Sequence, residues 1–335
     1  MIWLTWRQFR IQAIVAAVTL AVAAVALALN GRMLAQLYTD SGAAACPATG
    51  RCAALANFLA DARSGPTAVL FILGAALLYL VPPLIGVFWG APLVARELEA
   101  GTHRLVWNQS VTRDRWLGVK LAVLGAASMA FAGLLSVVVW WSSSKMDGAA
   151  LDRITPLMFG ARGIVPIGYA AFAFVLGVAA GILLRRTVPA MAATLAAYAG
   201  VTGAMVLWGR GHLLPAKHLS VAFDSDNPTS LHIGSNGRID VESRPNLPGA
   251  WIVGNQTVTP SGQPFAGQAD PQVCGPAVAP QKCMDWLATL NLQQSLTYQP
   301  ASRFWALQWA ETGVFLALAA LLVGFGFWWL RRRSA

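Results

Sequence analysis

Six blocks of apolar residues, each long enough to cross a lipid bilayer, constrain the fold of this chain more than any other feature of its sequence. The blocks cover residues 11–30, 67–94, 117–141, 164–184, 188–208 and 305–330. A transmembrane helix needs about 20 mostly apolar residues to cross a hydrocarbon core of about 30 Å. Charged residues make up only 11% of the chain, against about 25% in soluble domains. The sequence therefore predicts an all-α polytopic membrane protein built on a six-helix transmembrane bundle.

The distribution of basic residues predicts the orientation of these helices. If the N-terminus is cytoplasmic, the short segments on that side hold 12 of the 24 Lys and Arg residues but only 3 of the 14 acidic residues. Cytoplasmic loops of membrane proteins carry such an excess of Lys and Arg. We therefore expect a multi-pass protein of the plasma membrane with both termini in the cytoplasm. The net charge of +10 then reflects topology, so the expected partner is the lipid bilayer and not nucleic acid.

The first ten residues mix Trp, Phe and Arg side chains, a composition typical of a helix lying in the membrane interface. A cleaved signal peptide over residues 1–30 is the alternative. Because the apolar run exceeds the roughly 7–15 residues of a signal-peptide core, we expect it to remain as a transmembrane helix. The predicted parts are an interfacial helix at 1–10, transmembrane helices 1–5 over 11–208 with an outer loop at 31–66 and a cytoplasmic loop at 95–116, an external domain at 209–304, and the last transmembrane helix with a basic tail at 305–335.

Residues 209–304 differ from the transmembrane blocks because they are rich in Pro, Gly, Asn, Asp and Gln. Alternating stretches at 218–223, 238–242 and 251–259 predict short strands. Residues 284–295 predict a helix leading back to the membrane. We therefore expect a small α+β external domain.

The four cysteines form two close pairs, Cys46 with Cys52 and Cys274 with Cys283. Both pairs lie on the predicted outer, oxidising side, so we expect two local disulfides. Neither pair has CxxC spacing, and no His lies at ligand spacing beside either pair, so we expect no metal site.

Ionisable residues and nucleotide-binding motifs indicate which energy sources a membrane protein of this kind can use. A transporter driven by an ion gradient needs an ionisable side chain within the bilayer. Lys120 opens the third block, and the interiors of the first five blocks have none. Glu311, in the sixth, is either a coupling acid or an interfacial carboxylate that hydrogen-bonds a neighbouring helix, and we favour the second interpretation. The chain also lacks a G-x-x-x-x-G-K-[ST] phosphate loop, the motif that cradles ATP phosphates. We therefore expect no catalytic residue and no cofactor on this chain.

The cytoplasmic loop 95–116 carries the most distinctive pattern. Its apolar and polar residues fall on two sides of a helix, which predicts a short amphipathic helix that either rests on lipid or docks in a groove of a soluble partner. The loop reads Arg96-Glu97-x-Glu99-x-Gly101-Thr102, then Ser110-Val111-Thr112-Arg113, and Lys120 follows. This pattern resembles the loop after the second span of ABC-2-type ABC transporter permeases.

Three other stretches are similar to actinobacterial-type members of this family. They are Trp3-Leu4-Thr5-Trp6-Arg7-Gln8, Gly177-x-x-x-Gly181-x-x-x-Arg185-Arg186-Thr187-x-Pro189-Ala190, and Pro300-Ala301-Ser302-Arg303-Phe304-Trp305-x-x-Gln308. The resemblance covers most of the membrane part and is weak over residues 209–299.

The resemblance implies the permease subunit of an ATP-driven exporter in a bacterial cell membrane, which moves an apolar or amphipathic drug, peptide or lipid outward. It further implies a separate cytoplasmic ABC ATPase that holds ATP and Mg, and a second copy of the permease. The positions that match the family's coupling loop are Glu97, Gly101, Thr102, Arg104 and Arg113. The alternative is a non-transporting membrane sensor or immunity module whose external domain binds a peptide or antibiotic.

Overall fold

The computed structural model divides the chain into two compact units, one made of Met1–Leu213 with Trp305–Ala335 and the other of Leu214–Phe304. The structure describes residues 2–46, 52–101, 112–150, 153–223, 228–233, 239–243, 247–265, 267, 273–274 and 278–333.

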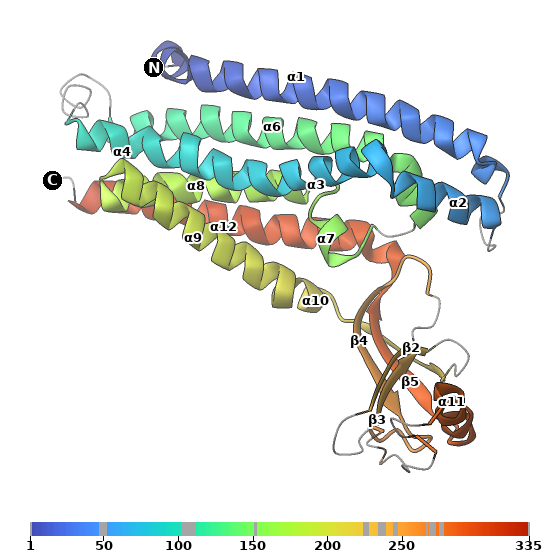
Figure 1. Ribbon diagram of the computed structural model, residues 1–335. Helices are drawn as coiled ribbons and strands as arrows, with labels where there is room; N and C mark the ends of the chain where they lie inside the picture. The colour runs from blue at the N-terminus through green and yellow to red at the C-terminus, as the bar shows by residue number, and fades with distance from the viewer. Residues whose placement is uncertain are drawn as a thin grey trace. The chain divides into compact units, whose positions relative to one another are not determined.

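The first unit is a bundle of long helices (Figure 1). Its helices are α1 (Ile2–Asp40), α2 (Ala53–Ala62), α3 (Gly65–Ile85), α4 (Ala91–Glu99), α6 (Arg113–Ala150), α7 (Pro156–Phe159), α8 (Val165–Leu184), α9 (Thr187–Ala204), α10 (Arg210–His212) and α12 (Phe304–Arg333). The π-helical turns η2 (Gly86–Gly90) and η3 (Met205–Gly209) join α3 to α4 and α9 to α10. Within the described part of the chain, six segments are long and apolar enough to cross a bilayer. The predicted six-helix transmembrane bundle is therefore confirmed.

Two boundaries differ from the prediction. α1 is one continuous helix from Ile2 to Asp40, so no break separates residues 2–10 from the first span. The fifth span runs through η3 and α10 to His212, past the predicted start of the external domain at residue 209. Helical backbone continues wherever its hydrogen bonds and packing allow, so composition alone fixes such ends only approximately.

α8 forms the centre of the bundle. In its most apolar stretch 78% of the residues are buried, whereas the other five spans range from 17% to 39%. Its contact with η2 and α4 requires glycine on both sides. A Cβ atom at Gly177 would lie 2.2 Å from the backbone oxygen of Gly86, and one at Gly90 would lie 2.3 Å from the backbone oxygen of Phe174. Small residues therefore let these backbones touch, as the GxxxG spacing of Gly177 and Gly181 favours.

Away from the centre, the last turns of α1 and α6 pack with α2. Their apolar cluster contains Leu34, Ala43, Phe58, Ala62 and Met146. The predicted disulfide between Cys46 and Cys52 is present and closes the connection from α1 to α2.

The second unit is a small α+β domain, as predicted. In the first sheet, β1 (Lys217–Ala222), β5 (Gln293–Gln299) and β4 (Trp251–Val258) are antiparallel neighbours in that order, and β2 (Pro228–Ile233) pairs with β3 (Ile239–Ser243) in a second sheet. α11 (Pro280–Thr289) contributes Cys283 and Leu287 to the apolar core. The predicted disulfide between Cys274 and Cys283 lies in this core.

The predicted helix at 284–295 is wrong in its second half. α11 ends at Thr289, Asn291 takes a left-handed conformation with φ +50°, and the chain continues as β5. β5 pairs with β1 on one edge and with β4 on the other. A strand with a neighbour on each edge can hydrogen-bond its backbone N–H and C=O groups on both sides. The stability gained from this pairing outweighs the local preference for helix. β2 was also missed by the sequence analysis.

Candidate functional site

Basic side chains gather at one end of the bundle, which we call the basic end. The start of α1, the ends of α4 and α12, the start of α6 and the turn between α8 and α9 lie there (Figure 1). The basic residues of these segments include Arg7, Arg10, Arg96, Arg113, Arg115, Lys120, Arg185, Arg186, Arg331 and Arg332. This end is the one predicted to be cytoplasmic, and it contains the loop that resembles the family's coupling loop.

Glu97, on the last turns of α4, forms a salt bridge with α6. Its Oε1 atom lies 2.6 Å from Nζ of Lys120, and the two side chains are 16% and 5% exposed, respectively. The Lys120 ammonium also lies 4.5 Å from the centre of the Trp116 ring. Because both side chains are largely buried, the two charged groups have lost most of their hydration. Either charge without the other would therefore be strongly unfavourable. Glu97 therefore fixes the end of α4 against α6.

Glu99 binds a different helix. Its carboxylate accepts hydrogen bonds from the backbone N–H of Thr187, at 3.0 Å, and from the Thr187 hydroxyl, at 2.8 Å. Thr187 is the first residue of α9, where unpaired N–H groups and the helix dipole favour a carboxylate. A helix turns about 200° over two residues, so Glu97 and Glu99 reach neighbours on opposite sides of α4. The sequence analysis did not select Glu99, although it belongs to the quoted motif.

A third contact joins α6 to α12 at the basic end. Nη2 of Arg331 lies 2.9 Å from Oδ2 of Asp114, but these side chains are 69% and 42% exposed. Exposed pairs contribute little to stability. Together the three contacts connect both sides of the loop to α6, α9 and α12.

The remaining predicted coupling residues are only partly described. Gly101 has φ +71° and follows the end of α4, the place where a left-handed glycine ends a helix. Arg113 begins α6 and is half-buried. Thr102 and Arg104 lie outside the described residues, as does most of the predicted amphipathic helix.

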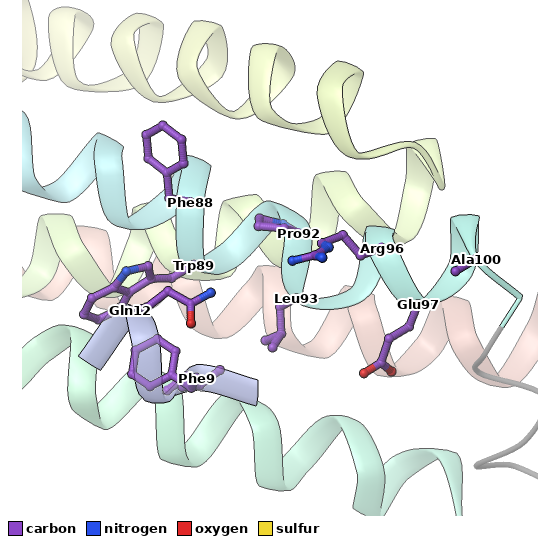
Figure 2. A pocket seen from close by; sticks show the side chains of 10 residues that line it. Phe9, Gln12, Phe88, Trp89, Pro92, Leu93, Arg96, Glu97 and Ala100 are labelled. Atoms are coloured by element: carbon purple, nitrogen blue, oxygen red, sulfur yellow. The ribbon is translucent and has the colours of Figure 1, made fainter. Parts of the chain in front are cut away.

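A pocket of about 390 Å³ opens beside the Glu97 salt bridge (Figure 2). α1 contributes Phe9 and Gln12, η2 contributes Phe88 and Trp89, and α6 contributes Leu124. The remaining lining residues are Pro92, Leu93, Arg96 and Glu97 of α4 and Ala100, which follows α4. Figure 2 shows Arg96 lying back over Pro92, whereas Glu97 points toward α6. The pocket thus has aromatic and aliphatic walls with charged groups at one end.

Away from the basic end, the bundle contains a buried polar cluster that the sequence analysis missed. Arg210 on α10 and Glu311 on α12 form a salt bridge of 2.7 Å in which both side chains are fully buried. The Tyr169 hydroxyl on α8 also donates to Glu311. Glu311 therefore bonds to neighbouring helices, as the favoured interpretation of this residue predicts. Arg210 was assigned to the external domain because it follows the apolar block, and its place in the fifth span makes that assignment wrong.

This cluster also holds the segment between α6 and α8. Arg210 Nη1 donates to the Pro156 carbonyl at 2.7 Å, and the Tyr79 hydroxyl donates to the Leu157 carbonyl at 2.7 Å. Gln308 Nε2 donates to the Phe159 carbonyl at 3.0 Å. Irregular backbone among transmembrane helices is tolerated only when protein or water satisfies its polar groups. Side chains from three helices do so here.

A second buried pair ties the same segment to α6. Arg162 Nε lies 2.8 Å from Oδ2 of Asp147, and the side chains are 1% and 7% exposed. Arg162 Nη2 donates to the other carboxylate oxygen at 3.2 Å. This two-point contact fixes the plane of the guanidinium group.

The fold and these sites define a multi-pass membrane protein in which apolar helices surround buried ion pairs. A model of the ABC-2 membrane transporter related family matches residues 17–210. The chain belongs to this family. No curated protein and no solved structure matches the chain. The matched region contains the loop at 95–116 and all of the first five spans except the start of the first and the end of the fifth. The chain is therefore a membrane component of a transporter.

Proposed function

We propose that this chain is the permease subunit of an ATP-driven exporter and that the loop at 95–116 receives the force of a separate cytoplasmic ABC ATPase. Two copies of the permease and two ATPase subunits form the working exporter in this proposal, and ATP and Mg bind to the ATPase. The exported substrate is apolar or amphipathic. The observation that carries the proposal is the attachment of both sides of the loop to different helices.

The attachment explains how a push on the loop would reach the membrane part. Glu97 binds Lys120 on α6, and Glu99 binds the first residue of α9. α4 itself packs against α8 through Gly181, where a Cβ atom would lie 2.7 Å from the backbone oxygen of Ala91. Because packed helices have few alternative arrangements, a displacement of α4 must move its neighbours with it.

The test measures ATPase binding and stimulation separately. The permease is reconstituted in nanodiscs with an ABC ATPase from its own genome, and co-purification and ATP hydrolysis are recorded for wild type, Glu99→Gln and Arg104→Glu. We expect Arg104→Glu to weaken co-purification, because it reverses a charge on the loop. We expect Glu99→Gln to retain the ATPase but to lose stimulation, because it loosens the link to α9.

Asp114→Asn is the matched control, since it removes one carboxylate from an exposed pair at the same end. It should resemble wild type in both measurements. If Arg104→Glu and Glu99→Gln both keep full binding and full stimulation, the loop does not couple the two subunits. If no ATPase binds the wild-type chain, the sensor or immunity function takes the place of the exporter.

A further inference from the structure

The pocket at the basic end combines an aromatic wall with one cation, Arg96, that forms no salt bridge with another described residue. Phe9 is buried and meets Trp89 edge to face, with ring centres 4.7 Å apart, and Trp89 lies 6.0 Å from Phe131 on α6. These contacts place three rings from α1, η2 and α6 in one group. The wall is therefore preformed, as in most sites that bind apolar ligands.

The π turn of η2 places the aromatic residues of this wall. Gly86 and Gly90 lie at its ends and touch the backbone of α8, where larger side chains would collide. π turns inside α-helices occur frequently at functional sites. With both glycines held against α8, the residues between them include Trp89, which packs inward, and Phe88, which is 54% exposed.

Arg96 supplies the cation. Its side chain is exposed, and within the described part of the chain it forms no hydrogen bond or salt bridge. Glu97, the other charged residue among the described lining residues, is neutralised by Lys120 at 2.6 Å. The net charge facing the pocket is therefore positive. A guanidinium group in this position is suited to bind a carboxylate or a phosphate through two hydrogen bonds.

The surroundings of the pocket indicate where its ligand comes from. On α1, near Phe9 and Gln12, the side chains of Ile11 and Ile14 are 68% and 60% exposed. Exposed apolar side chains on a transmembrane helix face lipid tails. Arg7 and Arg10 on the first turns of α1 are exposed as well, and basic residues next to a span attract anionic headgroups. The opening therefore lies where acyl chains and headgroups meet.

We propose that this pocket binds an anionic lipid of the adjoining leaflet. Arg96 binds the phosphate of the headgroup, and an acyl chain lies against Phe9, Phe88, Trp89 and Leu93. A volume of about 390 Å³ falls within the range of roughly 300–1,000 Å³ that is typical of small-molecule sites. The proposal is independent of the proposed function, because lipid binding requires no ATPase.

Photolabelling of the permease alone, in nanodiscs without nucleotide, tests this assignment. Phosphatidylglycerol and phosphatidylcholine that carry a diazirine on one acyl chain are compared, and labelled peptides are identified by mass spectrometry. We expect phosphatidylglycerol to label residues 88–97 about tenfold more than phosphatidylcholine does. Both lipids carry the phosphate, but the choline ammonium of phosphatidylcholine neutralises its charge and is repelled by the positive charge facing the pocket. Arg96→Gln should abolish this preference, and it leaves folding intact because the side chain is exposed.

Arg115→Gln is the matched control, because Arg115 is an exposed arginine at the same end that does not line the pocket. It should keep the preference for phosphatidylglycerol. Equal labelling by the two lipids overturns the proposal, and so does an equal loss in the two variants, which would mean a diffuse basic surface. The lipid proposal is also overturned if neither lipid labels residues 88–97 and residues 102–111 cross-link to them instead. The chain itself would then fill the pocket.

Discussion

Glu97 and Lys120 are the residues at the basic end whose charges depend most on each other. Each is largely buried, and each meets the other at 2.6 Å. Asp114 and Arg331 form a pair of similar length at the same end, but both are exposed to solvent. The two pairs therefore allow the contribution of burial to be measured within one molecule.

Glu97→Gln should lower the free energy of unfolding by about 3 kcal/mol, the lower end of the range for breaking a buried ion pair, because Lys120 keeps a charge with no counter-ion. Asp114→Asn should lower it by less than about 1 kcal/mol, because solvent screens that pair. Thermal unfolding of both variants in detergent or nanodiscs measures the difference. Equal destabilisation would contradict the assignment of Glu97 to a buried pair.

Arg210 and Glu311 allow the stability contribution of a fully buried ion pair to be measured, because neither side chain is exposed at all. Glu311→Leu should lower the free energy of unfolding by about 3–5 kcal/mol, since it leaves the buried Arg210 guanidinium without a counter-ion. Arg210→Met combined with Glu311→Leu should recover most of that loss, because an apolar pair of similar volume is often as stable as a buried ion pair. Thermal unfolding of the single and double variants tests this. A double variant as unstable as the single one would show that the charges themselves are required, for example to hold the Pro156 carbonyl.

At the scale of elements, α8 depends on glycines that let its backbone touch η2 and α4. Gly177→Val should disrupt this contact, because its Cβ atom alone would come within 2.2 Å of a backbone oxygen. Overpacking of this kind typically costs about 1–3 kcal/mol, and more where backbone must move. Gly200→Val on α9 is the control, since a Cβ atom there meets nothing within 4 Å. Thermal unfolding should separate the two variants clearly, and similar unfolding temperatures would argue against the close approach.

In the second unit, the Cys274–Cys283 disulfide joins the chain before α11 to α11 itself, inside the apolar core. Replacing both cysteines by serine should lower the stability of this unit by about 2–4 kcal/mol, because the unfolded chain then regains the freedom that the cross-link removes. Limited proteolysis of Leu214–Phe304 measures the loss. Replacing Cys46 and Cys52 by serine should leave proteolysis of this unit unchanged, because that pair belongs to the other unit. Free thiols at positions 274 and 283, found by non-reducing mass spectrometry, would remove the basis of the prediction.

For the whole molecule, the charge distribution predicts the orientation in the membrane. Positive charge gathers at one end of the bundle, and the positive-inside rule places that end in the cytoplasm. Ser235→Cys should then react with a membrane-impermeant maleimide in intact cells, whereas Ser110→Cys should react only after the cells are opened. Both positions lie outside the described residues, so the experiment relies on topology alone. Protection at 235 together with reaction at 110 would reverse the orientation.

The sequence by itself determined the six spans, the two disulfides and the family. Each depends on local information: about 20 apolar residues must cross a bilayer core, close cysteines can meet without long-range folding, and the loop motif is continuous in the chain. The resemblance also selected Glu97 as a coupling residue. That role stays a prediction, and the motif did not reveal that Glu97 contacts Lys120.

Tertiary structure decided which charges meet and which segments become strands. Lys120 lies 23 residues from Glu97, and Glu311 lies 101 residues from Arg210, so no local pattern could identify either partner. Hydropathy records how apolar a helix is but not which helices become its neighbours. The first residues of β5, 293–295, were read as helix for the same reason, because only β1 and β4 on its two edges make the extended conformation favourable.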